Sequence, residues 1–288
     1  MLTVLAPAKI NLTLEVLAKR PDGFHEIRSV IQTINLCDSL CLQLNRSIEF
    51  RCDKPNWIPE ESLLSRAVEL LQKTTGCTEG ALIEVNKRIP LISGLGGDSS
   101  GAAAVLRGLD KLWGLGLSQE ELLELAEQLG SDVVFLLYGG TALVEGRGEV
   151  VTPLPSLSHM WIVLMIPPVP RAKGKTGRLY ASLKTEHYTR AQITNRLVGL
   201  LTGGGGAIPP LQFNVFDDVA FDNFAGLEGY WHRFLEAGAQ EIHMAGSGPA
   251  LFALVEDEAE AEKIYDNLQK QGLESYLTET SGAIKPLE

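Results

Sequence analysis

The sequence predicts an α+β protein built from two units, on three observations. The first half of the chain carries strand-like apolar patches followed by apolar residues at helical spacing. The second half again alternates strand-like and helical segments, and a proline-rich stretch at 153–158 separates the halves. A chain of 288 residues is long enough for two domains, which we expect to span residues 1–155 and 156–288.

The first half is expected to begin with strands. Strand-like patches lie at residues 2–6, 10–17, 26–35 and 39–53. The tripeptide Pro21-Asp22-Gly23 predicts a turn between the second and third patches. A helix is expected near 62–75, with Glu60 and Glu61 at its start. Residues 81–86 then alternate like a half-buried strand.

A glycine-rich loop follows at residues 93–100, with the sequence Ser93-Gly94-Leu95-Gly96-Gly97-Asp98-Ser99-Ser100. A helix is expected behind it, because Val105, Leu109 and Leu112 repeat at helical spacing. Ser118 and Glu121 form a capping box that opens another helix. The expected buried stripe of that helix is Leu122, Leu125, Ala126 and Leu129.

The second half predicts a separate α+β unit. Strands are expected at 161–166, 241–245 and 250–255, and helices near 187–201, 224–237 and 258–270. Asp257 and Glu260 form a capping pair for the last helix. The glycines and prolines of 203–210 predict a mobile loop.

Composition excludes several classes of partner. The chain has 25 Lys and Arg against 36 Asp and Glu, a net charge of −11, which argues against non-specific binding to nucleic acid or an anionic membrane. The longest apolar stretch, 160–166, is far shorter than the roughly 20 residues of a membrane-spanning helix. The first residues lack a basic leader, so no signal peptide is expected. The scattered cysteines suit a cytosolic protein with reduced thiols: Cys37, Cys41, Cys52 and Cys77.

The glycine-rich loop indicates phosphate binding. Backbone amides without Cβ atoms can approach a polyphosphate, and a helix N-terminus adds unpaired donors. Ser99 and Ser100 could cap the helix or offer hydroxyls to phosphate or a metal. Two standard phosphate motifs fail: Gly174-Lys175-Thr176 matches a Walker A tail, but Val169 stands where its first glycine belongs. A Rossmann fingerprint starting at Gly94 fails because Ser99 replaces its third glycine.

A serine hydrolase is an alternative from another class. Residues 97–101 fit G-x-S-x-G, and chain order permits a triad of Ser99, Asp132 and His243. A nucleophile elbow must follow a strand directly, however, and the strand before it stops ahead of Pro90. A plain strand-to-helix loop is the other alternative.

Five segments together resemble the GHMP kinase superfamily. They are Ala6-Pro7-Ala8-Lys9-Ile10-Asn11-Leu12, Lys87-Arg88-Ile89-Pro90, the loop 93–100, Gly130-Ser131-Asp132-Val133 and Ala245-Gly246-Ser247-Gly248-Pro249. The resemblance covers nearly the whole chain and implies a ribosomal protein S5 domain 2-like N-terminal domain and a ferredoxin-like C-terminal domain. Within the superfamily, the segments 7–12 and 21–25 resemble those of kinases that act in isoprenoid precursor synthesis and phosphorylate an alcohol linked to cytidine diphosphate.

The resemblance implies an ATP site and a catalytic pair. The residues implied at the ATP phosphates are Gly94, Leu95, Gly96, Gly97, Ser99 and Ser100. Lys87 is implied near the nucleotide, and Ser99 or Ser100 at Mg²⁺. In phosphoryl transfer the protein mainly positions groups and stabilises charge. Asp132 is implied to accept the proton of the acceptor hydroxyl, with Lys9 supporting the charged carboxylate.

The resemblance also implies a cytidine subsite. Phe24 and Tyr180 would stack on the two faces of the base, and His25 would bind its edge. Asn11 would bind polar groups of the substrate, and Thr176 keeps the family spacing to Tyr180. Residues 246–248 would close on the active site or form a simple turn.

Three residues depart from the family pattern. Asp98 stands where a third glycine is usual, Gly101 replaces Asn or Asp, and Val134 replaces a proline. Asp98 could bind Mg²⁺, point outward or weaken ATP binding. The remaining alternatives are therefore a GHMP kinase for another small alcohol and a nucleotide-binding protein without turnover. The sequence makes no prediction of oligomeric state.

Overall fold

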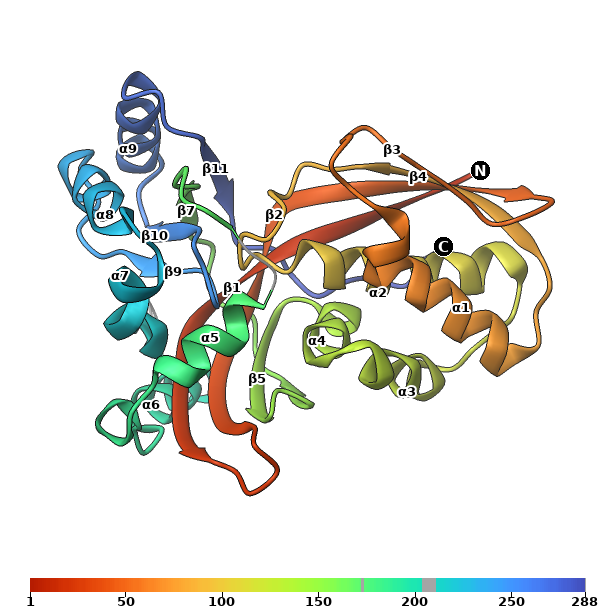
Figure 1. Ribbon diagram of the computed structural model, residues 1–288, viewed down its shortest axis with the longest axis horizontal. Coiled ribbons are helices and arrows are strands. Elements are labelled where there is room, and N and C mark those ends of the chain that lie inside the picture. The colour runs from red at the N-terminus through yellow and green to blue at the C-terminus, as the bar shows by residue number, and fades with distance from the viewer. Residues whose placement is uncertain (172–173, 204–210, 288) are drawn as a thin grey trace.

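The computed structural model describes residues 1–171, 174–203 and 211–287. Two sheets organise it (Figure 1). Most of the loop expected at 203–210 therefore lies outside the described residues.

The first sheet has seven strands, and its long strands form a hairpin. The strands are β1 (Leu2–Lys19), β2 (His25–Asn45), β3 (Glu49–Cys52), β4 (Gly80–Asn86), β5 (Thr141–Gly146), β6 (Val150–Pro153) and β8 (Phe213–Asn214). The order is β3-β4-β2-β1-β8, with β5 paired to β2 and β6. The patches expected at 2–6 and 10–17 form one strand, β1. Pro7 lies between them at a shift in the pairing register, where a residue without an N–H is tolerated and does not end the strand. The turn expected at Pro21-Asp22-Gly23 is confirmed.

Four helices cover one face of this sheet (Figure 1). They are α1 (Leu63–Thr75), α2 (Gly97–Trp113), α3 (Gln119–Leu129) and α4 (Ser131–Tyr138). The capping box of Ser118 and Glu121 is confirmed, and Ser62 caps α1. Glu60 and Glu61 lie in a separate 3₁₀ turn, Pro59–Glu61. The short, almost wholly apolar α4 was not expected, because its sequence lacks helical periodicity.

The second sheet has four antiparallel strands, β7 (Trp161–Met165), β9 (His243–Met244), β10 (Leu251–Val255) and β11 (Ser275–Glu279). Their order, β11-β7-β10-β9, is that of a ferredoxin-like sheet and confirms the expected fold of this unit. β11 was not expected, and the strand expected at 241–245 is only two residues long.

The helices of this unit are α5 (Lys175–Ser182), α6 (Gln192–Thr202), α7 (Ala220–Asn223), α8 (Leu227–Glu236) and α9 (Glu258–Lys270), with 3₁₀ turns at Thr185–His187 and Val215–Val219. α9 and its Asp257 cap agree with expectation. The helix expected at 187–201 begins only at Gln192. The helix expected at 224–237 is α8, which begins at Leu227, and the short α7 before it was not expected. α5 was not expected.

The two halves are joined along β1. Its residues Ala8, Ile10 and Leu12 are buried in a cluster with Leu164 and Phe252 of the second sheet. Successive side chains of a strand point to opposite faces, so Lys9 and Asn11 point the other way. Two later segments of the chain also return to the first half. β8 pairs with β1, and near the C-terminus Thr280 forms a bridge with Ile34 of β2 and Ala283 with Gly139. No helix in the described ranges is both long and apolar enough to cross a membrane.

Candidate active site

A pocket of about 980 Å³ lies where the two halves meet. It is lined by β1, the turn after it, the glycine-rich loop, the starts of α4 and α5, and the loop before β10. The expected site residues that line it are Lys9, Asn11, Phe24, His25, Lys87, Gly94, Gly96, Gly97, Ser99, Asp132, Thr176 and Tyr180. Leu95 and Ser100 do not line it.

Lys9 and Asp132 meet in the middle of this pocket. The Lys9 Nζ lies 3.6 Å from Asp132 Oδ2 and donates a hydrogen bond of 3.0 Å to Asn11 Oδ1. Asn11 in turn donates to Ser29 Oγ at 2.9 Å, which fixes its amide. The Lys9 side chain is 6% exposed and that of Asp132 41%, so the carboxylate is the group that a ligand can reach.

The glycine-rich loop brings the N-terminus of α2 to the pocket. Gly96, with φ of 74°, is the N-cap, and neither serine caps the helix. A side chain at Gly94 cannot fit, because its Cβ would lie 2.0 Å from the carbonyl oxygen of Ala245. The loop therefore packs directly against residues 245–248, and the first amides of α2 face the pocket without a side-chain cap.

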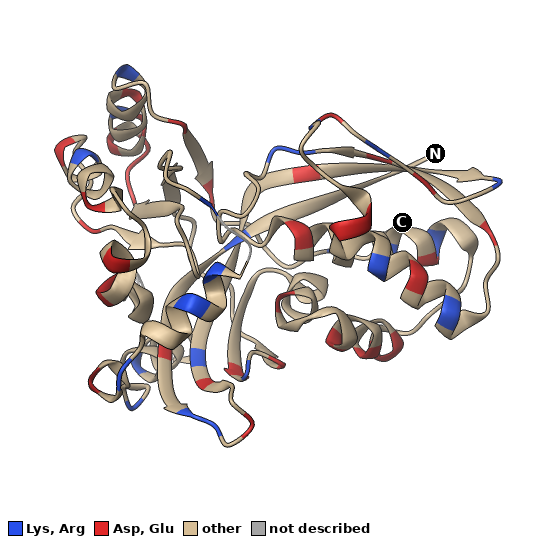
Figure 2. Cartoon of the chain, in the orientation of Figure 1, with Lys and Arg blue, Asp and Glu red and all other residues tan. Residues whose placement is uncertain are grey.

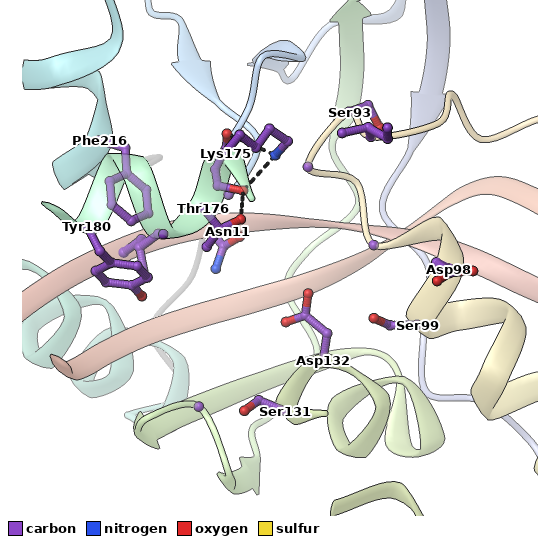
Figure 3. A pocket seen from close by; sticks show the side chains of 18 of the residues that line it. Asn11, Ser93, Asp98, Ser99, Ser131, Asp132, Lys175, Thr176, Tyr180 and Phe216 are labelled. Atoms are coloured by element: carbon purple, nitrogen blue, oxygen red, sulfur yellow. Dashed lines mark hydrogen bonds between the residues drawn. The ribbon is translucent and has the colours of Figure 1, made fainter. Parts of the chain in front are cut away.

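Two residues expected at the phosphates are engaged elsewhere. Leu95 is fully buried in the core, and its amide donates to Ser93 Oγ at 3.4 Å. The Ser100 amide donates a hydrogen bond of 2.9 Å to the Gly96 carbonyl, as in any helix. The Ser100 hydroxyl is buried, whereas Ser99 points into the pocket near Asp132 (Figure 3).

Lys87 lines the pocket, but its charge is already compensated. Its Nζ forms a buried ion pair with Asp38. The second oxygen of Asp38 accepts the amides of Arg88 and Ile89 at 2.7 and 2.8 Å. A Cβ on Gly97 would lie 3.5 Å from the Lys87 Nζ, so the lysine lies beside the start of α2.

The aromatic residues gather at the other end of the pocket. Phe24 is 55% exposed, and the guanidinium of Arg147 lies 5.0 Å from its ring centre. The His25 ring stacks on Tyr180 at 4.8 Å and 19°, so it covers a face of Tyr180 that was expected to meet the base. Burial, and then the positive charge of Lys19, lower the pKa of His25 and favour the neutral imidazole.

Lys175 was missed as a site residue. It begins α5 and is buried, and its Nζ donates to the carbonyl and the hydroxyl of Ser247 at 3.1 and 2.7 Å. The Thr176 hydroxyl lies 2.8 Å from the same Ser247 hydroxyl (Figure 3). The only sequence signal was Gly174-Lys175-Thr176, which fails as a Walker tail. Residues 246 and 247 form a turn and also line the pocket.

Basic residues outnumber acidic ones in the lining of the pocket, although the chain as a whole is acidic. Figure 2 shows basic positions on α5 and on the strand beside it, whereas the charged positions of α3 are acidic. Burial lowers the pKa of Lys175 to about 8; the charge of Lys9 acts in the same direction and that of Asp132 opposes it. Burial, and then Asp132, raise the pKa of Tyr180 to about 12, so its phenol stays protonated.

Two of the three departures from the family pattern, Asp98 and Gly101, have structural roles. Asp98 Oδ2 accepts the amide of Leu63 at 3.0 Å and so binds the N-terminus of α1. Gly101 allows α1 and α2 to approach, because its Cβ would lie 2.6 Å from Leu64 Cδ1. Val134 is buried in α4.

The serine hydrolase alternative is wrong. His243 does not face Ser99; its Nδ1 lies 2.7 Å from Asp217 Oδ2 and its Nε2 lies 3.2 Å from Glu241 Oε1. Ser99 lies within the first turn of α2 and not at the end of a strand.

Comparison with known proteins agrees with this geometry. The family model described as GHMP kinases N terminal domain matches residues 62–140, and GHMP kinases C terminal matches 197–273. A 4-diphosphocytidyl-2-C-methyl-D-erythritol kinase of Dehalococcoides mccartyi is 48% identical over 99% of this chain and 100% of that protein. The protein of the same name from Geobacillus thermodenitrificans is 40% identical over 93% of each chain.

Solved structures show the same relationship. A crystal structure of 4-(cytidine 5'-diphospho)-2C-methyl-D-erythritol kinase is 31% identical, with a TM-score of 0.82 over 98% of this chain and 100% of the other. Homoserine kinase from Cytophaga hutchinsonii, at 21% identity and a TM-score of 0.73 over 98% and 94% of the two chains, shares the fold. The chain therefore belongs to the GHMP kinases and, among them, to the family of the 4-diphosphocytidyl-2-C-methyl-D-erythritol kinases.

Proposed function

We propose that this protein transfers the γ-phosphoryl group of ATP to the 2-hydroxyl of 4-diphosphocytidyl-2-C-methyl-D-erythritol, a step in isoprenoid precursor synthesis. The names of its relatives support this substrate. The observation that carries the proposal is the position of the Lys9–Asp132 pair. It lies in one pocket with the uncapped start of α2 and with the aromatic residues Phe24, His25 and Tyr180.

The pair suits transfer to a hydroxyl. The oxygen of the substrate's 2-hydroxyl bonds to the γ-phosphorus, and Asp132 accepts the proton of that hydroxyl. The bond between the γ-phosphorus and the β–γ bridging oxygen breaks, which releases ADP. The ammonium of Lys9, held by Asn11, offsets the negative charge of the transferring group. The first amides of α2 bind the phosphate oxygens, as helix N-termini commonly do.

We place the adenosine at the end of the pocket away from the aromatic residues. Ile58 and Ile92 line the pocket, 48% and 43% exposed, and they precede the turn before α1 and the glycine-rich loop. A planar base covering them would remove apolar surface from water. Lys87, fixed by Asp38, borders the phosphates from the same side.

The residues present fit a Mg²⁺ ion that arrives with ATP. The described part of the chain holds no cluster of three His, Cys, Asp or Glu side chains for a metal. Mg²⁺ is usually held by one or two protein groups, water and substrate phosphates. We assign the protein ligand to the Ser99 hydroxyl and not to Ser100, which is turned away from the pocket. The ion would neutralise charge on the phosphates.

We place the cytidine at the aromatic end. Phe24 offers an exposed ring for stacking, and the neutral His25 imidazole can donate and accept at a base edge. For a base to stack on the face of Tyr180 that His25 covers, His25 must first leave it. Thr176 lies beside this ring on α5 and borders the same end.

The division into domains 1–155 and 156–288 is also a proposal. It is supported by the chain passing from β6 to β7, and thus from one sheet to the other, near residue 155. We further propose a cytoplasmic location, with ATP and the cytidyl alcohol as small-molecule partners and no nucleic acid or membrane partner. The four free cysteines and the acidic net charge support it.

An ADP-release assay with a panel of alcohols tests the proposal. We expect turnover with 4-diphosphocytidyl-2-C-methyl-D-erythritol and none with homoserine or mevalonate. Turnover only with another alcohol would show that the proposed substrate is wrong. Binding of ATP without turnover on any alcohol would favour a nucleotide-binding protein.

A further inference from the structure

Lys175 differs from the other buried lysines of the pocket in the charge of its partners. Lys9 lies near the Asp132 carboxylate, and Lys87 pairs with Asp38. The hydrogen bonds that the structure shows for the Lys175 ammonium go to two neutral oxygens of Ser247. At 7% exposure it has also lost most of its hydration. A buried cation without a bonded anion is costly, which indicates that a ligand supplies the anion.

The position of Lys175 identifies where that anion would lie. Residues 246 and 247 are neighbours in one loop, and they approach two lysines from different elements. A Cβ on Gly246 would lie 2.9 Å from the Lys9 Nζ, while Ser247 accepts from Lys175. The same loop packs on Gly94 of the glycine-rich loop. The two ammonium groups therefore border the part of the pocket that lies between the glycine-rich loop and Asp132.

We propose that Lys175 is a further catalytic residue, whose ammonium binds the γ-phosphate of ATP and stabilises it during transfer. This inference rests on the proposed kinase reaction. As the substrate oxygen bonds to the γ-phosphorus and the bond to the ADP oxygen breaks, the hydroxyl proton goes to Asp132. Lys175 keeps its protons throughout and acts by its charge on the phosphoryl oxygens.

The titration of Lys175 supports this role. The charged groups that face it from neighbouring elements are Lys9 on β1 and Asp132 on α4, and Tyr180 lies further along α5. Without ligand, burial and Lys9 lower its pKa to about 8, so the ammonium is lost as the pH rises through that value. A bound phosphate favours the charged form and raises the pKa again. The loss should therefore appear in kcat/KM for ATP, which reports free enzyme, and at higher pH in kcat.

Nucleotide binding tests the assignment without an acceptor alcohol. Lys175→Gln can still donate to Ser247 but carries no charge, and Lys175→Arg keeps the charge. We expect Lys175→Gln to weaken binding of a non-hydrolysable ATP analogue by roughly tenfold or more, with ADP binding unchanged. The matched control is Arg178→Gln, an exposed cation on the same helix, which should change neither. Unchanged ADP binding also shows that the variant is folded.

Turnover with the cytidyl alcohol completes the test. We expect Lys175→Gln to lower kcat by about 100-fold. Lys175→Arg should retain turnover and move the decline of kcat/KM above about pH 8 to higher pH, because a guanidinium does not titrate there. Equal loss of analogue and ADP binding, or a decline at the same pH in Lys175→Arg, would overturn the proposal. If the wild-type protein does not use this alcohol but Lys175→Gln still discriminates the analogue from ADP, the proposed substrate fails and the assignment of Lys175 stands.

Discussion

The ammonium of Lys9 lies 3.6 Å from the carboxylate of Asp132 and so joins β1 to the first turn of α4. Lys9 is fixed from both ends, since its backbone amide donates to the Leu95 carbonyl at 2.9 Å and its Nζ to Asn11. Asp132 is the more exposed partner. The arrangement gives a carboxylate that can reach a hydroxyl, next to a cation that cannot move away.

Replacing Asp132 by Asn should therefore affect chemistry more than binding. Asp132→Asn removes the proton acceptor but keeps the shape of the side chain, so we expect kcat to fall by about 100- to 10,000-fold. The KM for ATP should change little, because the amides of α2 are untouched. Steady-state kinetics check both values, with Asp266→Asn on the exposed face of α9 as the control. Turnover near the wild-type level would remove Asp132 from the mechanism.

Phe24 should act on one substrate only. Phe24→Ala removes a ring that is 55% exposed, so the free energy of unfolding should change by less than about 1 kcal/mol. We expect the KM for the cytidyl substrate to rise by roughly tenfold through the loss of stacking, with the KM for ATP unchanged. Phe221→Ala, another exposed phenylalanine, provides the matched control. Equal increases in both KM values would argue against stacking on the base.

The family segments located much of the site from sequence alone. Lys9, Asn11, Asp132 and Thr176 occur in short motifs, and the structure brings them into one pocket. The glycine-rich loop was located as a whole, but the direction of each of its amides was not. Leu95 is buried in the core, which composition alone cannot reveal.

The rest depends on contacts between distant segments. α4 is buried nearly all round, so it has no apolar stripe that could identify it as a helix. β11 is defined by pairing with β7, far earlier in the chain. Lys175 is identified as a site residue by its contact with Ser247, which no spacing in the sequence predicts.

Replacing Asp98 should affect two properties, the capping of α1 and the binding of ATP. Asp98→Asn keeps an oxygen that can accept the Leu63 amide but removes a negative charge from the first turn of α2, where we place the phosphates. We expect its KM for ATP to fall severalfold, since like charges repel. Asp98→Ala should lower the KM similarly and also reduce the free energy of unfolding by about 1 kcal/mol through loss of the contact. Urea unfolding and ATP titration separate the two effects, and a higher KM in Asp98→Asn would indicate instead that the carboxylate assists nucleotide binding.

Gly101 should show opposite effects in two backgrounds. In the wild-type chain, Gly101→Ala places a Cβ 2.6 Å from Leu64 Cδ1 in a fully buried contact. Overpacking of about 1 to 3 kcal/mol should exceed the gain in helix propensity of about 1 kcal/mol, so the variant should be less stable.

Leu64→Ala provides the background in which this clash is absent. That substitution alone should cost about 2 to 5 kcal/mol, because Leu64 is 1% exposed. Adding Gly101→Ala to it should then stabilise the protein by about 1 kcal/mol, the propensity gain alone. The double-mutant cycle, measured by urea unfolding, should give a coupling of about 2 kcal/mol. If Gly101→Ala changes the free energy of unfolding by the same sign and size in both backgrounds, the contact with Leu64 does not set how closely α1 and α2 approach. Gly101 would then be required for another reason.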